Sequence, residues 1–76
     1  MQETLHSVPL DTDVVLTGIT HPMRRRLAEL GIREGVTVKV TQRTSGGGRV
    51  VDINHTRYAI DGRTARALLV RPPEEL

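Results

Sequence analysis

One segment, Met23–Val40, constrains the fold of this 76-residue chain most strongly, because the period of its apolar residues changes within it. The first part has helical spacing, and three apolar residues would share one face: Met23, Leu27 and Leu30. We expect a helix from about residue 22 to residue 30 that turns this face to the core. The second part alternates valine with polar residues from residue 36 onward, which is the period of a strand.

A proline and two glycines set the limits of this helix and of the turn that follows it. Pro22 suits the start of a helix, where a missing N–H is tolerated. Gly31 suits the left-handed residue that ends many helices, and Ile32 should then fold back onto Leu27. Gly35 supplies a second turn before the strand. A helix, a stop and a strand in so short a stretch predict a small, strongly bent β structure.

We expect one domain over residues 1–76, with a loose lead-in at 1–7 and an ordered core over about 8–71. Strand patterns occur at 14–17, 36–43, 49–53, 57–60 and 68–70. Between them, 45–48 reads as a hairpin connector, 54–55 as a tight turn, and Asp61 as the cap of one helical turn. The fold class is therefore mainly β: a small barrel of about five strands, closed to remove its edges. One short α-helix follows the first strand and plugs the mouth of the barrel.

Composition excludes several classes of protein. The chain contains no cysteine, so neither disulfides nor a thiolate metal cluster can stabilise it. No apolar run approaches the roughly 20 residues that cross a bilayer, and residues 1–7 do not read as a signal peptide. We therefore expect a protein that does not itself span a membrane and that stays where it is made.

Three consecutive arginines, Arg24, Arg25 and Arg26, are the candidate binding residues. They spread over roughly 200° of a helix surface, so they cannot all face the core. They stand in the first half of the helix, where the helix dipole disfavours positive charge. Glu29 follows Arg25 by four residues, which is the weaker orientation of a helical ion pair. Two interpretations remain: a surface for an anionic partner, and a solvated polar face whose arginine stems cover apolar surface.

Metal binding, catalysis and nucleic-acid binding find fewer signals. His21 and His6 are the candidate metal ligands, but they stand in different segments and no H-E-x-x-H pattern is present. The alternative is that they are ordinary surface histidines, with His21 capping the helix. No pattern of nucleophile, base and orienting acid appears, so we expect no enzyme. The single aromatic residue, Tyr58, argues against RNA or proline-rich peptide as a ligand.

The stretch from Arg25 to Val40 resembles the signature of the ferrous iron transport protein A (FeoA) family, approximately R-R-L-x-E-L-G-L-x-P-G-x-x-V-x-V. The resemblance continues at 14–19, at 58–60 and at 68–70. Glu34 departs from it, because the family often has proline there, and the loop at 44–48 is richer in glycine than the family's.

The resemblance implies an SH3-like β-barrel and a cytoplasmic, non-enzymatic accessory protein of ferrous iron uptake. It implies a partner, the FeoB-like membrane ferrous transporter, whose cytosolic part carries a GTPase domain and would hold the protein at the inner face of the cell membrane. We expect the docking surface to include Arg24, Arg25, Arg26 and Glu29, with no required cofactor and no nucleic acid. Two alternatives stay open: a sensor or carrier of Fe²⁺ or another transition metal, and an SH3-like barrel that binds RNA or peptide.

Overall fold

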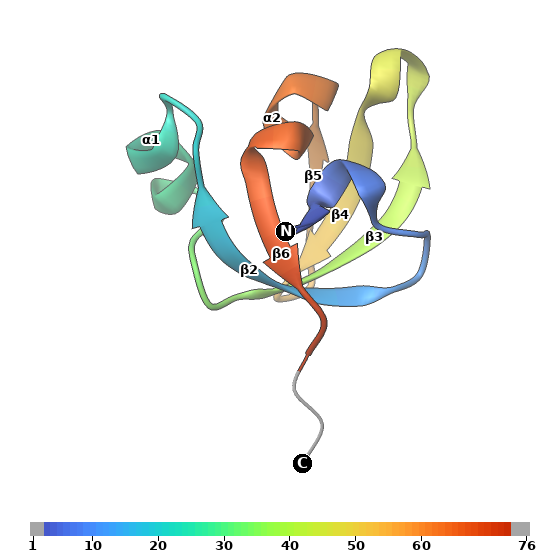
Figure 1. Ribbon diagram of the computed structural model, residues 1–76, viewed down its shortest axis with the longest axis horizontal. Coiled ribbons are helices and arrows are strands. Elements are labelled where there is room, and N and C mark those ends of the chain that lie inside the picture. The colour runs from blue at the N-terminus through green and yellow to red at the C-terminus, as the bar shows by residue number, and fades with distance from the viewer. Residues whose placement is uncertain (1–2, 74–76) are drawn as a thin grey trace.

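The computed structural model describes residues 3–73, which form one antiparallel sheet of six strands with short helices at its ends (Figure 1). The strands are β1 Glu3–Thr4, β2 Asp13–Ile19, β3 Thr37–Arg43, β4 Arg49–Ile53, β5 Thr56–Ile60 and β6 Leu68–Arg71. They lie in the order β1-β6-β2-β3-β4-β5. The connections contain two α-helices and two 3₁₀ turns, which are α1 Arg24–Glu29, α2 Gly62–Ala67, η1 Leu5–Ser7 and η2 Ser45–Gly47. The prediction of a mainly β fold is confirmed.

The sheet curls without closing. Its two edge strands are β1 and β5, and within residues 3–73 no pairing joins them. The predicted closure is therefore wrong, and so is the loose lead-in, because Glu3 pairs with Val70 and the following Leu5 is fully buried. A two-residue strand is too short to produce a readable alternation, and a single buried leucine produces no period. Residues 1–2 of the lead-in lie outside the described residues.

Two β-bulges give the sheet its curl, and both contain a threonine. Thr17 sits where the register of β2 against β6 shifts, and Thr41 sits where β3 shifts against β4. The Thr17 hydroxyl donates to the carbonyl oxygen of Leu69 (3.2 Å), and the Thr41 hydroxyl donates to that of Val50 (3.2 Å). Because bulges bend a strand and increase its twist, these two positions turn a flat sheet into a cup around the core.

The core inside this cup is aliphatic. Its fully or nearly fully buried residues come from all strands except β1 and from the connections: Leu5, Val8, Val14, Leu16, Ile32, Val38, Val40, Val51, Ile53, Ile60, Ala65, Leu68 and Val70. Tyr58 is only partly buried and packs against this cluster. The predicted tight turn is confirmed, since Asn54 (φ 51°) and His55 (φ 66°) are both left-handed, as a two-residue hairpin between β4 and β5 requires.

Helix α2, and not the helix at 22–30, covers the core at one end of the sheet. The Asp61 carboxylate accepts the N–H of Thr64 (2.7 Å), which confirms the predicted cap, and Ala65 is fully buried. Figure 1 shows α2 beside η1 over the curled sheet, whereas α1 stands outside it. The prediction that the first helix plugs the mouth is therefore wrong. Each α-helix in residues 3–73 has six residues, and no helix in this range is long and apolar enough to cross a bilayer.

Candidate partner-binding surface around helix α1

The start of α1 is capped by the residue two positions before Met23. The Nδ1 atom of His21 accepts the N–H of Met23 (3.0 Å), and the His21 carbonyl accepts the N–H of Arg24 (3.1 Å). The helix begins at Arg24, so Pro22 lies in the turn before it rather than in its first position. His21 therefore has a structural role at this helix, in agreement with the interpretation that it caps the helix.

The end of α1 has the glycine stop that the sequence predicts. Gly31 is left-handed (φ 99°), and its N–H donates to Ala28 (3.0 Å) while the N–H of Ile32 donates to Leu27 (2.9 Å). These two bonds are the paired pattern of a Schellman turn, which satisfies the last carbonyl groups of a helix. Ile32 is buried and belongs to the core that Leu27 packs against. The expected return of the chain onto Leu27 is confirmed, and Gly35 is left-handed as well (φ 93°).

The expected burial of a whole helical face is wrong. Leu27 packs against the core, but the Met23 side chain is 47% exposed and that of Leu30 is 53% exposed. The reason is the length of the helix. Met23 and Leu30 are its flanking residues, outside the six helical positions, so helical spacing no longer directs their side chains to the core. No residue within α1 is buried.

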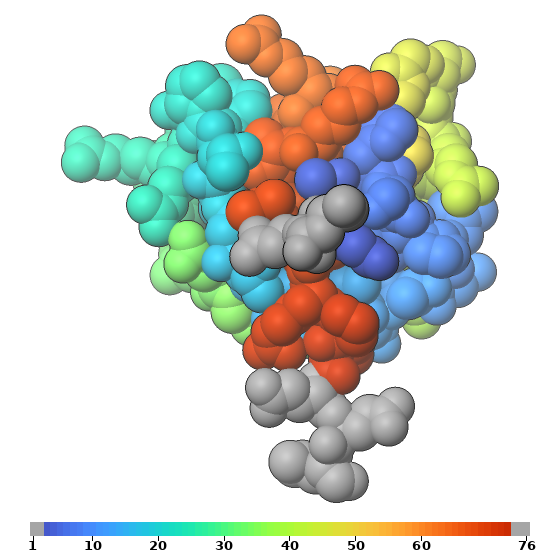
Figure 2. All heavy atoms as spheres, viewed as in Figure 1, coloured from blue at the N-terminus to red at the C-terminus, as the bar shows by residue number. Residues whose placement is uncertain are grey.

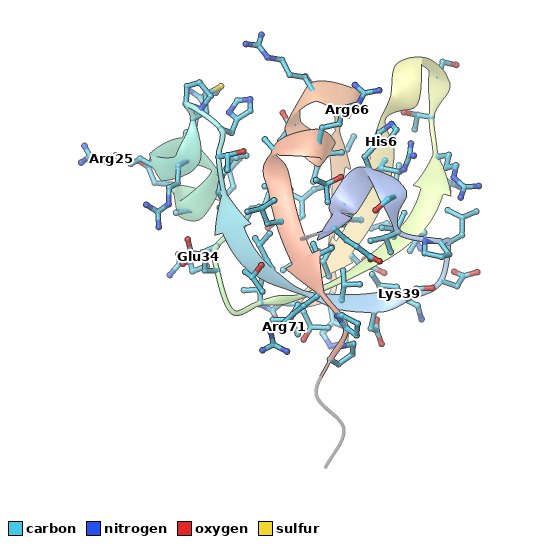
Figure 3. The ribbon with its side chains drawn as sticks, in the orientation of Figure 1. His6, Arg25, Glu34, Lys39, Arg66 and Arg71 are labelled. Carbon is cyan, nitrogen blue, oxygen red and sulfur yellow. The ribbon has the colours of Figure 1, made fainter. Side chains whose placement is uncertain are left out.

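The three arginines face solvent, as predicted. Arg24, Arg25 and Arg26 are all exposed, and Arg25 points away from the body of the protein (Figure 3). In the space-filling view α1 forms a protrusion at the left side of the molecule (Figure 2). Arg24 forms an ion pair with Glu34 (2.9 Å), not with an acid of its own helix. Glu29 is exposed and forms no ion pair with any residue in the described range 3–73.

An open hollow of about 470 Å³ lies against the outer side of α1. It is lined by three arginines, one glutamate and two small or branched apolar residues: Arg24, Arg25, Arg33, Glu34, Ala28 and Ile19. The Nη2 atom of Arg33 donates to the carbonyl oxygen of Ala28 (2.8 Å), which fixes one guanidinium at the rim. Sequence reasoning did not include Arg33 or Glu34 in the site, because only the turn at Gly31 brings them back to α1.

A second hollow, of about 360 Å³, lies between α1 and the edge strand β5. Its lining is mainly apolar. It includes the exposed residues that flank the helix, Met23 and Leu30, together with the partly or fully buried Leu27, Ile32, Tyr58 and Ile60. The Tyr58 hydroxyl donates to the carbonyl oxygen of Leu30 and thereby ties the end of α1 to β5. Helix α1 therefore presents a cationic hollow on one side and an apolar one on the other.

The histidines predicted as metal ligands stand in different surroundings. His21 caps α1, and its Nε2 atom lies 3.5 Å from the Thr64 hydroxyl. Burial, followed by the charges of Arg66 and Arg49, lowers the pKa of His6, and such positive surroundings disfavour a bound cation. Within residues 3–73 no group of three or more His, Cys, Asp or Glu side chains could hold a metal ion.

Two aspartates also line a third hollow of about 300 Å³ on the outer face of the sheet. Lys39 pairs in register with Asp13 on one side and with Asp52 on the other, and Asp52 pairs in turn with Arg57. The Nε of Arg57 lies 3.9 Å from the carboxylate of Asp52. Charges of alternating sign across four strands balance each other, so this face offers no net charge to a ligand.

Comparisons with known proteins agree with this architecture. FeoA from Stenotrophomonas maltophilia, an SH3 domain protein solved in complex with zinc, is 30% identical (TM-score 0.76), with 91% of this chain and 89% of that chain covered. FeoA from Chlorobium tepidum is 23% identical (TM-score 0.83), covering 92% and 70% of the two chains. A manganese-dependent transcriptional repressor is 20% identical (TM-score 0.85), covering 95% of this chain but 42% of the repressor chain.

The SH3-like fold implied by the sequence is thus confirmed. No protein among the curated ones matches the sequence significantly. The family model of the FeoA domain matches residues 3–72, which is nearly all of the described chain. The chain belongs to the FeoA family.

Proposed function

We propose that this protein is an accessory protein of ferrous iron uptake that acts by binding another protein and not by catalysis. Membership of the FeoA family supports the link to iron uptake. For the 30% identical relative from Stenotrophomonas maltophilia, a role as a bacterial ferrous iron transport activating factor has been suggested. The partner we propose is the cytosolic, GTPase-containing part of the membrane ferrous transporter. Binding there would place the protein in the cytoplasm, at the inner face of the membrane.

The observation that carries the proposal is that α1 is a helix without a buried residue, whose three arginines face solvent. A helix of this length gains little stability from its own sequence, and positive charge in its first turns opposes the helix dipole. The ion pair of Arg24 with Glu34 is exposed and adds little stability, so fold stability accounts poorly for three consecutive arginines. An acidic surface on a partner accounts for them, because guanidinium groups form bidentate hydrogen bonds with carboxylates.

The two hollows beside α1 define what such a partner would present. Acidic side chains would face Arg24, Arg25 and Arg33 around the first hollow. An apolar side chain would enter the second, between Leu30 and Tyr58. Interfaces that combine a buried apolar anchor with a charged rim gain affinity from the former and association rate from the latter. By binding one state of the transporter more tightly than another, the protein would shift the transporter toward that state.

Charge reversal on α1 tests this docking surface. In the double variant Arg24→Glu with Arg25→Glu, we expect the affinity for the purified cytosolic domain of the transporter to fall about tenfold or more, because like charges across an interface repel each other. Titration of that domain measures the affinity, and uptake of ⁵⁵Fe²⁺ in cells that lack the native protein should fall in parallel.

The matched control reverses two arginines elsewhere on the surface. Arg43, on β3, and Arg63, on α2, are both exposed, so Arg43→Glu with Arg63→Glu changes the net charge by the same amount. We expect this variant to bind and to support uptake as the wild type does. Unchanged binding of the α1 variant, with an unchanged melting temperature, would rule out α1 as the docking surface.

A transition metal is the second candidate ligand, since the Stenotrophomonas relative was solved with zinc. Calorimetry with Fe²⁺ or Zn²⁺ on the isolated protein separates the two functions. A sensor or carrier would bind the metal stoichiometrically in the absence of any partner. A docking module would bind the transporter domain and would show no stoichiometric metal binding on its own.

A further inference from the structure

A group of basic side chains lies away from α1, at the place where η1, the η2 hairpin and α2 meet. His6 comes from η1, Arg49 from the first position of β4, and Arg66 from the last turn of α2. Figure 3 shows His6 and Arg66 together near the η2 hairpin, on the opposite side of α2 from Arg25. The proposed docking of α1 uses none of these residues, so the group needs an explanation of its own.

Arg49 holds this junction together from the inside. Its side chain is buried, with the residue only 7% exposed. Its Nη1 atom donates to the carbonyl oxygens of Gly47 (3.0 Å) and Gly48 (2.8 Å), and its Nη2 atom donates to that of His6 (2.8 Å). The Nε atom has no hydrogen-bond partner among residues 3–73. Carbonyl groups satisfy the N–H donors but bring no negative charge, so the positive charge of a buried guanidinium stays uncompensated.

The side-chain nitrogens of His6 and Arg66 converge beside Gly47, which has no side chain of its own to hold them apart. A Cβ atom at Gly47 would lie 3.4 Å from Nε2 of His6 and 3.6 Å from Nη2 of Arg66. Because both nitrogens surround the same point, they are at most about 7 Å apart. Charge-assisted hydrogen bonds are about 2.7–2.9 Å long, so one tetrahedral oxyanion can accept hydrogen bonds from both nitrogens at once.

The two permanent charges beside His6, those of Arg66 and Arg49, are both positive. Within residues 3–73 no ion pair joins a carboxylate to His6, Arg49 or Arg66. The cap of α2, Asp61, instead interacts with Thr64 and with the charges of His21 and Arg63. Burial and then the charges of Arg66 and Arg49 lower the pKa of His6, so the free protein keeps this imidazole neutral over a wider pH range.

We propose that His6 and Arg66, on either side of Gly47 and next to the buried guanidinium of Arg49, bind a phosphate group. Arginine binds phosphate through several N–H donors, and a dianion compensates more positive charge here than a single carboxylate does. The bound dianion also favours the protonated imidazole, which turns His6 into a second charged donor. The phosphate is either free inorganic phosphate or part of a nucleotide, since both present the same oxygens.

The test is a titration of the three histidines by NMR in sodium phosphate and in sodium chloride at equal ionic strength. We expect phosphate to raise the pKa of His6 by about 0.5 unit or more, because an adjacent anion stabilises the imidazolium. The exposed His55 is an internal reference and should shift little. Equal shifts of all three histidines, or no shift of His6, would overturn the proposal.

Two glycines provide a matched pair of variants. Gly47→Ala places a methyl group in contact with the nitrogens of His6 and Arg66, whereas Gly46→Ala introduces a side chain at a similar positive φ (84° at Gly47, 76° at Gly46) with no atom within 4 Å. Both variants carry the same kind of backbone strain. We expect phosphate affinity to fall about tenfold or more in Gly47→Ala and to stay within about twofold in Gly46→Ala. Equal affinity in the two variants would contradict the site.

If Gly47→Ala does not fold, arginine variants replace it. Arg66→Gln should abolish the phosphate-dependent shift of His6, while Arg63→Gln, an exposed arginine of the same helix, should preserve it. Retention of the shift in Arg66→Gln would overturn the proposal. Titration with a nucleoside diphosphate then identifies the source of the phosphate. Binding at least tenfold tighter than that of inorganic phosphate assigns a nucleotide, and equal binding assigns free phosphate.

Discussion

Helices α1 and α2 have the same length, six residues each, and both are rich in arginine, yet they are held in place by different means. α2 has a carboxylate cap, Asp61, and two buried residues, Gly62 and Ala65. α1 has no buried residue, and its N-cap Met23 offers no side-chain acceptor. The difference is between a helix that closes the core and a helix that stands on its surface.

The surface helix is fixed mainly through its backbone and through residues outside it. Tyr58 and Arg33 donate to the carbonyl oxygens of Leu30 and Ala28, and Gly31 sets the turn that follows. Because these contacts use carbonyl groups, most side chains of α1 stay available to a partner. In α2 the six residues cover the core at one end of the sheet, and both arginines of this helix are exposed. Short helices of similar composition thus serve stability or recognition according to which groups hold them.

The largest difference should come from enlarging one alanine in each helix. Ala65 is fully buried in the core, so Ala65→Leu should lower the free energy of unfolding by about 1–3 kcal/mol through overpacking. Ala28 lines the open hollow beside α1, so Ala28→Leu should change it by less than about 0.5 kcal/mol. Urea denaturation measures the free energy of unfolding of both variants. An equal decrease in the two would mean that α1 is packed as tightly as α2.

A smaller effect is expected from removing the external tie of α1. Tyr58→Phe deletes the hydroxyl that donates to Leu30 and should destabilise the protein by about 0.5–1.5 kcal/mol. The loss should be local. Amide exchange should accelerate at Ile32, whose N–H bonds to Leu27 at the end of α1, and should change little at Ala65, whose N–H bonds to Asp61 in α2. Equal acceleration at both amides would show that α1 has no independent stability.

Local signals predicted the parts of the fold that local chemistry controls. The left-handed stop at Gly31, the cap at Asp61 and the turn at Asn54 each depend on neighbours within a few residues, and each is confirmed. The spacing of the three arginines also predicted that they could not all face the core, and all three are exposed. The bulges at Thr17 and Thr41 were not predicted, because a bulge is a shift of register against the partner strand, and the sequence of one strand does not show its partner's register.

What sequence reasoning missed depends on contacts that are distant in the chain. Arg24 pairs with Glu34 across a turn, and the guanidinium of Arg49 bonds to His6, forty-three residues away. Arg49 occupies an inward position of β4 together with Val51 and Ile53. Its place in the alternation of the strand is that of a core residue, whereas arginine is a residue type expected at the surface. Only the carbonyl groups of η1 and the hairpin, brought together by the fold, make that burial tolerable.

The smallest expected effect is the loss of stability in acid that comes from the carboxylate cap of α2, for which α1 has no counterpart. Hydrogen bonds from the hydroxyl and the N–H of Thr64 lower the pKa of Asp61, so the unfolded chain takes up a proton at this residue as the pH falls through 3.8, before the folded protein does. Asp61 therefore stabilises the fold above pH 3.8, and this contribution is lost as the pH falls through the lower, folded pKa. Asp61→Asn keeps a good cap acceptor, so at pH 7 its stability should stay close to that of the wild type. Urea denaturation between pH 2 and pH 4 should show a flatter loss of stability for Asp61→Asn, and an equally steep loss would mean that the charge of Asp61 does not hold α2.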